Sequence, residues 1–228
     1  MAKIRLGTIV GQISGSAGAT TFSHGRFGAY IRLRSIPVQP DSPRQLARRA
    51  AMGGNSAAWG LLIPTVRLAW KVWAENNPIT DRLGDKRILS GHQAYVGLNS
   101  RLDVIGAANI SSPPVKPGPD ALTAVSMTAS VATQAAILTY TATPIGAGKC
   151  LWINGAKTPT ATVNYIKNLL RFIEYSATAQ ASPYQVDYFA IKLGALTLGE
   201  CLIANCHVFD TATGLLSPPL QARCTVAA

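Results

Sequence analysis

The sequence predicts an α+β protein in which a basic module with helices precedes an all-β sandwich. Helix-type apolar spacing and helix-cap residues are concentrated before residue 113, whereas short apolar runs separated by turn residues follow it. Charge changes at the same place. Residues 1–112 hold 14 Lys and Arg against 5 Asp and Glu, a net charge of +9, while residues 113–228 hold 7 against 5, a net charge of +2. We therefore expect a docking module over 1–112, a proline-rich linker over 113–120 and a sandwich over 121–228.

Residues 1–36 have the pattern of two or three short strands joined by tight, glycine-containing turns. In the last of these runs, strand alternation places Tyr30, Arg32 and Arg34 on one face. Ile31, Leu33 and Ser35 fall on the other face. Residues 37–40 (Pro-Val-Gln-Pro) then predict an extended connector.

Three helices are expected after this connector. Asp41 or Ser42 caps the first helix, with Pro43 in its first turn; residues 53–54 (Gly-Gly) either interrupt this helix or allow close packing. Pro64 starts the second helix and Ser90 caps the third. The apolar spacing predicts a core seam between helices, formed by Trp59, Leu62, Val66, Trp70 and Trp73.

Seven apolar runs with turn signals between them predict an immunoglobulin-like or fibronectin-type sandwich in the second half. The expected strands are 122–131, 135–143, 150–154, 169–178, 185–192, 200–209 and 220–226. Trp152 on the third strand is expected in the core of this sandwich.

The sequence offers no catalytic cluster, so we expect no enzyme, no catalytic residues, no cofactor and no metal. The three histidines and ten acidic residues are scattered. Cys206 and His207 are adjacent, but neighbours on a strand point to opposite faces. The four cysteines match no common zinc spacing and are expected to be reduced, buried apolar residues rather than disulfides.

Neither a signal peptide nor a run of 18 apolar residues occurs in the sequence, which predicts synthesis in a cytoplasm and no membrane contact. Charged residues make up only 14% of the chain. That low share favours surface that is buried against other chains.

The clustered arginines are the main functional signal. We expect Arg32, Arg34, Arg44, Arg48 and Arg49 to contact acidic surfaces of partner proteins. The same residues could lie near nucleic acid, where binding would weaken with salt, or could form an ordinary solvated surface.

The first half resembles small structural proteins of tailed bacteriophages and related prophage families. The resemblance covers most of residues 1–102, and it is carried by residues 3–7 (Lys-Ile-Arg-Leu-Gly), 15–18, 30–37, 40–49, 68–70 and 89–99. The second half is similar in architecture to the immunoglobulin-like modules that phages append to virion proteins, and residues 210–217 resemble the final hairpin turn of such modules.

This resemblance implies a virion component. Its expected partners are other virion proteins and copies of itself, within a homo-oligomeric assembly that forms the capsid decoration, the neck or the tail. Two alternatives stay open at this stage: a DNA-binding or DNA-packaging protein that uses the same arginines, and a host-surface adhesin that acts through the β module.

Overall fold

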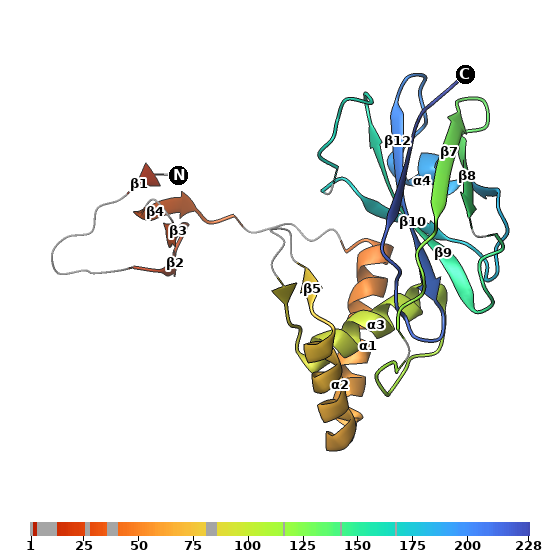
Figure 1. Ribbon diagram of the computed structural model, residues 1–228. Helices are drawn as coiled ribbons and strands as arrows, with labels where there is room; N and C mark the ends of the chain where they lie inside the picture. The colour runs from red at the N-terminus through yellow and green to blue at the C-terminus, as the bar shows by residue number, and fades with distance from the viewer. Residues whose placement is uncertain are drawn as a thin grey trace. The chain divides into compact units, whose positions relative to one another are not determined.

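The computed structural model describes residues 2–3, 13–25, 28–35, 41–80, 86–115, 117–141, 143–166 and 168–228. Helices and antiparallel sheets are both present (Figure 1), so the mixed fold class is confirmed. The chain divides into two compact units, residues 1–46 and 47–228. This division lies in the first turn of a helix and not in the predicted linker at 113–120. The predicted connector at 37–40 falls outside the described residues.

The first unit contains a small antiparallel sheet. Its strands are β1 (Ala2–Lys3), β2 (Gly15–Ala17), β3 (Thr20–Gly25) and β4 (Gly28–Leu33). They are ordered β1-β4-β3-β2.

Three helices begin at the residues whose chemistry predicts a helix start. They are α1 (Pro43–Leu61), α2 (Pro64–Asn76) and α3 (Gly91–Ile105), and a two-stranded ribbon of β5 (Ile79–Thr80) and β6 (Lys86–Arg87) lies between α2 and α3 in the chain. Ser90 forms a capping box with Gln93, in which each side chain accepts from the other residue's backbone N–H at 3.2 and 3.1 Å. Helix α1 continues through the two glycines that could have interrupted it.

The predicted tryptophan seam is the core of the helical part. Trp70 is fully buried, and its ring meets those of Trp73 and Tyr95 edge-on at centroid distances of 5.8 and 5.4 Å. Trp59 reaches Tyr95 at 5.5 Å. Such edge-on pairs stabilise a cluster beyond the area that they bury.

Two buried asparagines fix how the helices meet. Asn99 accepts from the Ile110 N–H at 2.8 Å and donates to the Ile110 carbonyl at 3.1 Å, which holds the segment after α3 against that helix. Asn55 on α1 donates to the Asp103 carboxylate at 2.7 Å and accepts from Asn109 at 2.9 Å. Because buried polar groups are costly without partners, these bonds select one packing arrangement.

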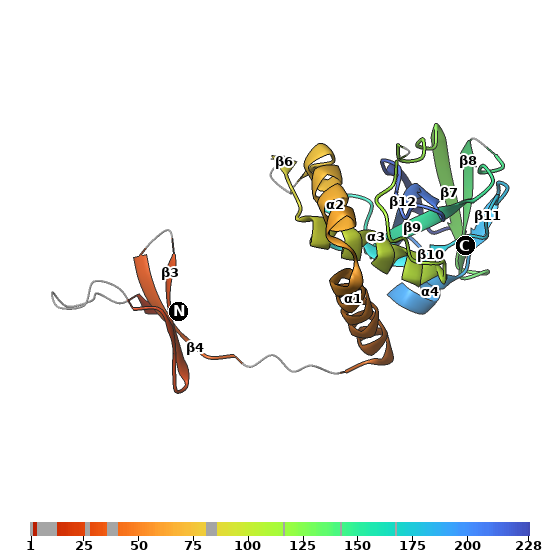
Figure 2. The ribbon, with the colours of Figure 1, turned by 90° about the horizontal axis from the view of Figure 1, so that it is seen from below.

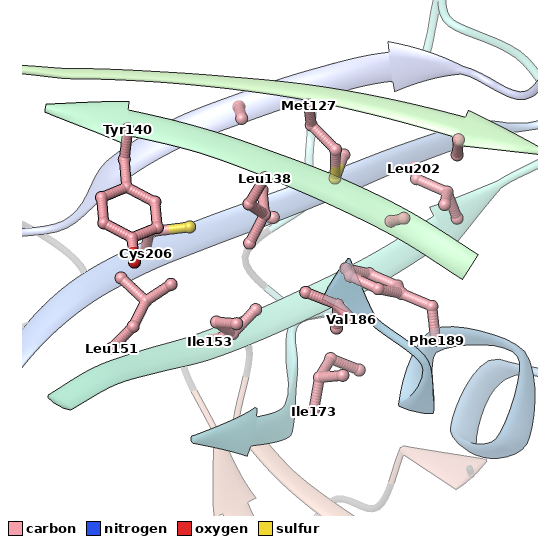
Figure 3. Close-up of a cluster of buried hydrophobic side chains, with 14 of the residues drawn as sticks. Met127, Leu138, Tyr140, Leu151, Ile153, Ile173, Val186, Phe189, Leu202 and Cys206 are labelled. Carbon is pink, nitrogen blue, oxygen red and sulfur yellow. The ribbon is translucent and has the colours of Figure 1, made fainter. Parts of the chain in front are cut away.

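The second half forms a sandwich of two antiparallel sheets. Its strands are β7 (Ala124–Ser130), β8 (Ala135–Thr141), β9 (Lys149–Thr158), β10 (Arg171–Tyr175), β11 (Tyr184–Val186), β12 (Cys201–Asp210) and β13 (Leu220–Thr225). A three-stranded sheet, β11-β8-β7, faces a four-stranded sheet, β10-β9-β12-β13. The side chains between them form the main core (Figure 3), which includes Met127, Leu138, Tyr140, Leu151, Ile153, Ile173, Val186, Leu202 and Cys206.

The expected strand over 185–192 is wrong in its second part. After β11 the chain turns into a short helix, α4 (Tyr188–Leu193), which places Phe189 in the sandwich core. Gly155 on β9 makes room for this ring, because a Cβ there would lie 2.5 Å from Phe189 Cε1. The space for Phe189 depends on Gly155, which lies far earlier in the chain. The local strand pattern of residues 185–192 therefore could not reveal the helix.

Trp152 does not lie in the sandwich core, contrary to expectation. Leu151 and Ile153 point into that core, so Cys150 and Trp152 occupy the outer face of the same strand. There Trp152 packs on Phe172 and Phe209 at centroid distances of 4.4 and 5.3 Å.

Helix α3 and the segment after it cover this outer face. Leu102, which is fully buried, joins Cys150, Trp152 and Phe209 in one cluster, with Ile105 and Ile110 packed around it. The view from below shows α3 beside β9 and β10 (Figure 2). Strands β9 and β12 are therefore buried on both faces, and most residues along each of them are buried.

The turn after β12 also contacts α3. Gly214 has a φ of +73°, and a Cβ there would lie 3.0 Å from the Leu98 carbonyl oxygen. Arg101 reaches the Gly214 carbonyl at 3.4 Å. The helical part and the sandwich thus share one packed interior.

Gly214→Ala should test this contact. Gly199 also has a positive φ, of +83°, but a Cβ there would meet nothing within 4 Å. We expect Gly199→Ala to cost about 1–2 kcal/mol of unfolding free energy from backbone strain. Gly214→Ala should cost roughly 1–3 kcal/mol more, because the methyl also pushes α3 from the sheet. Denaturant unfolding of both variants measures the difference, and equal losses would contradict the close packing.

His207 should make stability depend on pH. Its Nδ1 donates to the Ser217 carbonyl at 2.8 Å. Burial lowers the pKa of His207; the hydrogen bond to Ser217 raises it, and the nearby Arg101 charge lowers it. Because the unfolded chain then binds a proton more readily than the folded one, the unfolding free energy should fall as pH drops below about 6.5. His207→Asn keeps an N–H donor and should show a smaller loss between about pH 7.5 and pH 5 in denaturant titrations.

Candidate interaction surface

The strand register divides the N-terminal sheet into an apolar face and a polar face. Residues directly opposite each other share a face, and Phe22 pairs with Ile31 while Thr20 pairs with Leu33. Thr21 pairs with Arg32, and Ser23 with Tyr30, on the other face. The predicted alternation along β4 is therefore observed.

The described side chains on the apolar face of this sheet are at most partly buried. No side chain that the structure describes in residues 13–46 is buried. Phe22 and Ile31 are half-buried, and Leu33 is 80% exposed. A sheet normally buries its apolar face against a second layer, and the described residues of this unit supply no such layer.

Three of the predicted contact arginines belong to this first unit. Arg32 lies on the polar face of the sheet beside Thr21. Arg34 follows β4, where its backbone N–H donates to the Ala19 carbonyl at 2.8 Å, and Arg44 lies in the first turn of α1. All three side chains are exposed.

The other two arginines belong to the second unit. Arg48 on α1 donates to the Ser100 carbonyl on α3 at 3.3 Å, so it also holds the two helices together. Arg49 is exposed on the same helix, and its side chain is not without an interaction partner. The five predicted residues are thus divided between the two compact units.

A groove in the helical part was missed by the sequence analysis. It has a volume of about 730 Å³ and lies between α2 and the proline-rich segment that we expected to be a linker. Leu68 and Val72 form the helix side and are 59% and 47% exposed. Pro113, Pro114 and the fully exposed Val115 form the other side. The sequence signal for this groove is the spacing of Leu68 and Val72, four residues apart on α2 and outside the tryptophan seam.

Reactive groups in the described residues do not assemble into a metal or thiol site. No group of three or more His, Cys, Asp and Glu side chains there is placed to hold a metal ion. The four cysteines are unbridged. Burial raises the pKa of the Cys150 thiol to about 11 and that of Cys206 to about 12, which keeps both in the unreactive thiol form.

One polar cluster lies at the edge of the sandwich, beside a hollow of about 400 Å³. The Tyr184 hydroxyl donates to the buried Glu174 carboxylate at 2.7 Å, and Lys192 donates to the Ile173 carbonyl. Burial and the Glu174 carboxylate raise the pKa of Tyr184. These contacts attach α4 and β11 to β10, so we assign the cluster a structural role.

Comparisons with known proteins give little for this chain. No family model and no curated protein matches it. Among solved structures, it is similar to a protein described as Fn3-like from Clostridium thermocellum, at 17% identity and a TM-score of 0.28, over 49% of this chain and 97% of that one. A likeness at that TM-score supports neither a shared fold nor a shared function. Within the described residues, no helix has the length and apolar character needed to span a membrane.

Limited proteolysis should separate the two units. Trypsin should cut after Arg32, Arg34 and Arg44 before it cuts within the sandwich, since residues near these sites lack buried side chains. Mass spectrometry of the dilute protein should show a persistent product that begins between residues 45 and 50. Early cleavage inside β9 or β12 would contradict this order.

Proposed function

We propose that the protein is a structural component of a multi-copy particle and acts through protein–protein assembly. The observation that carries this proposal is the uncovered apolar face of the N-terminal sheet. Burying a large apolar side chain contributes about 1.5–3 kcal/mol, and a sheet with no covered face is only marginally stable alone. Phe22, Ile31 and Leu33 therefore gain stability when another chain covers them.

The exposed apolar surface of the second unit supports the same proposal. Leu61 and Ile63, at the junction of α1 and α2, are 87% and 62% exposed, and Leu68 and Val72 on α2 are 59% and 47% exposed. Contiguous apolar patches on soluble proteins commonly mark sites of interaction with other proteins. Two such surfaces on one chain favour an assembly over a solitary monomer.

We further propose that the particle is of the tailed-phage type, in which this chain decorates the capsid or belongs to the neck or tail. The motifs within residues 1–102 support this assignment through their resemblance to phage structural proteins. We infer that the sandwich is of the fibronectin type, because β10 joins the sheet of β9, β12 and β13 and not that of β7 and β8. The sandwich would then be the module that projects from the particle or packs laterally within it.

A DNA-binding role is the second candidate. Arg32 and Tyr30 share the polar face of the sheet, and Arg34 follows on the exposed chain. Arginine with an aromatic ring is a common combination on nucleic-acid-binding surfaces. Binding of short DNA duplexes that weakens steeply with salt, and that Arg32→Glu with Arg34→Glu abolishes, would favour this role over protein assembly.

Substitutions on opposite faces of the same sheet test the assembly proposal. Phe22→Asp with Ile31→Asp places two charges on the apolar face, whereas Thr21→Asp with Ser23→Asp places the same charges on the polar face. We expect the wild-type chain and the polar-face variant to form oligomers, rings or particles, and the apolar-face variant to stay monomeric. Analytical ultracentrifugation and electron microscopy give the readout.

The control is the unfolding transition of residues 47–228, measured in each full-length variant. Both variants should keep the wild-type transition of that unit. A wild-type chain that stays monomeric at every concentration would count against the assembly proposal. So would an apolar-face variant that assembles as well as the wild type.

A further inference from the structure

A row of amide side chains crosses the outer face of the four-stranded sheet. Asn205 on β12 stands directly opposite Asn154 on β9 and Gln221 on β13. Residues opposite each other share a face, and the two neighbours of Asn205, Ala204 and Cys206, belong to the sandwich core. Asn154, Asn205 and Gln221, the amide row, therefore point away from that core.

The outer face is covered on both sides of the amide row. On one side, two residues back along β9, Trp152 packs under α3 and the segment that follows it. On the other side, Ile166 and Leu170 from the connection between β9 and β10 pack on Cys201 and Ile203 of β12. The amide row is thus a polar strip of sheet between two covered stretches of the same face.

An arginine fixes the chain beside this strip. Arg223 follows Gln221 by two residues on β13 and so stands on the same face. Its guanidinium donates to the Ala161 and Val163 carbonyls, both at 2.9 Å. A segment that is already held in place loses little conformational entropy when a ligand binds next to it.

The protein uses only part of the hydrogen-bonding capacity of the amide row. The Trp152 indole N–H donates to Asn154 Oδ1 at 3.2 Å. The Gln221 amide donates to Asn205 Oδ1 at 3.0 Å. In the described part of the chain, no group accepts from the Nδ2 of Asn154 or of Asn205, although both side chains are half-buried. Such donors gain from a ligand that brings acceptors.

The surroundings of the amide row favour an uncharged ligand. On the described outer face of β9, β12 and β13 there is no Asp or Glu. Burial lowers the pKa of His207, which keeps its imidazole neutral at pH 7. The guanidinium groups of Arg101 and Arg223 are directed to backbone carbonyls. Because an amide presents a donor beside an acceptor, it matches the hydroxyl groups of a sugar, each of which both donates and accepts.

We propose that the amide row binds an uncharged oligosaccharide that lies across the strands of the four-stranded sheet. Sugar hydroxyls accept from the Nδ2 groups of Asn154 and Asn205 and donate to Gln221 Oε1. Neighbouring strands are about 4.8 Å apart, so the three amides extend over roughly 10 Å, which is more than one sugar ring. This activity goes beyond assembly, and in a multi-copy particle many weak sites would act together on a carbohydrate surface.

Nuclear magnetic resonance of the full chain detects this binding at a known place. The probes are neutral tetrasaccharides of glucose, galactose, mannose and N-acetylglucosamine, each at millimolar concentration. The indole N–H signal of Trp152, assigned with Trp152→Phe, should shift because this group donates to Asn154 of the amide row. The indole signal of Trp70 should stay, because that group donates to the Ser111 carbonyl in the helical part.

Removal of two amides tests which residues hold the sugar. Asn205→Ala with Gln221→Ala removes a bonded pair together, so neither side chain leaves its partner unsatisfied. We expect the affinity for the bound tetrasaccharide to fall about tenfold or more. Thr128→Ala with Gln185→Ala is the matched control, because both residues stand opposite Ile137 on the outer face of the other sheet. Its affinity should equal that of the wild type.

The remaining outcomes decide against the inference. It falls if no tetrasaccharide shifts the Trp152 signal, or if the alanine pair binds as tightly as the wild type. It also falls if binding weakens steeply with salt, since charged groups and not amides would then hold the ligand. Thermal unfolding checks each variant, and Asn205→Val with Gln221→Val, which suits a strand, replaces an alanine pair that does not fold. The apolar surfaces named for assembly are unchanged in these variants, so sedimentation judges that proposal separately.

Discussion

The packing of α3 on the outer face of the four-stranded sheet is the contact on which the second unit depends. Leu102 closes over Cys150, Trp152 and Phe209, so β9 and β12 are covered on both sides. Gly214 allows the helix backbone to approach the turn that follows β12. Without this helix the sheet would expose an aromatic surface to water, and the sandwich would lose one of its two apolar layers.

The helices also hold in place the chain that leads into the proline-rich segment. Asn99 holds both backbone polar groups of Ile110, and Trp70 donates to the Ser111 carbonyl at 2.7 Å. The chain therefore leaves α3 in a set direction and runs beside α2 before it enters β7. The groove between α2 and residues 113–117 is a consequence of this course, and it leaves Leu68 and Val72 uncovered.

The N-terminal sheet presents the opposite situation. Its strands pair in good register, yet the described side chains have no second layer to pack on. Backbone pairing alone contributes little net stability, because the unfolded chain bonds equally well to water. Phe22 and Ile31 are half-buried and Leu33 is exposed, so this sheet keeps apolar side chains at its surface.

Local signals in the sequence determined where α1 and α3 begin, because Pro43 and the Ser90–Gln93 capping box act within one helical turn. They also determined the strand runs of the sandwich and the two faces of β4, since alternation depends only on neighbouring residues. Tertiary structure alone decided which face of β9 holds Trp152, where Phe189 finds room and which segment divides the compact units. A continuous apolar run indicates that both faces of a strand are buried, but what covers each face is set by residues far away in the chain.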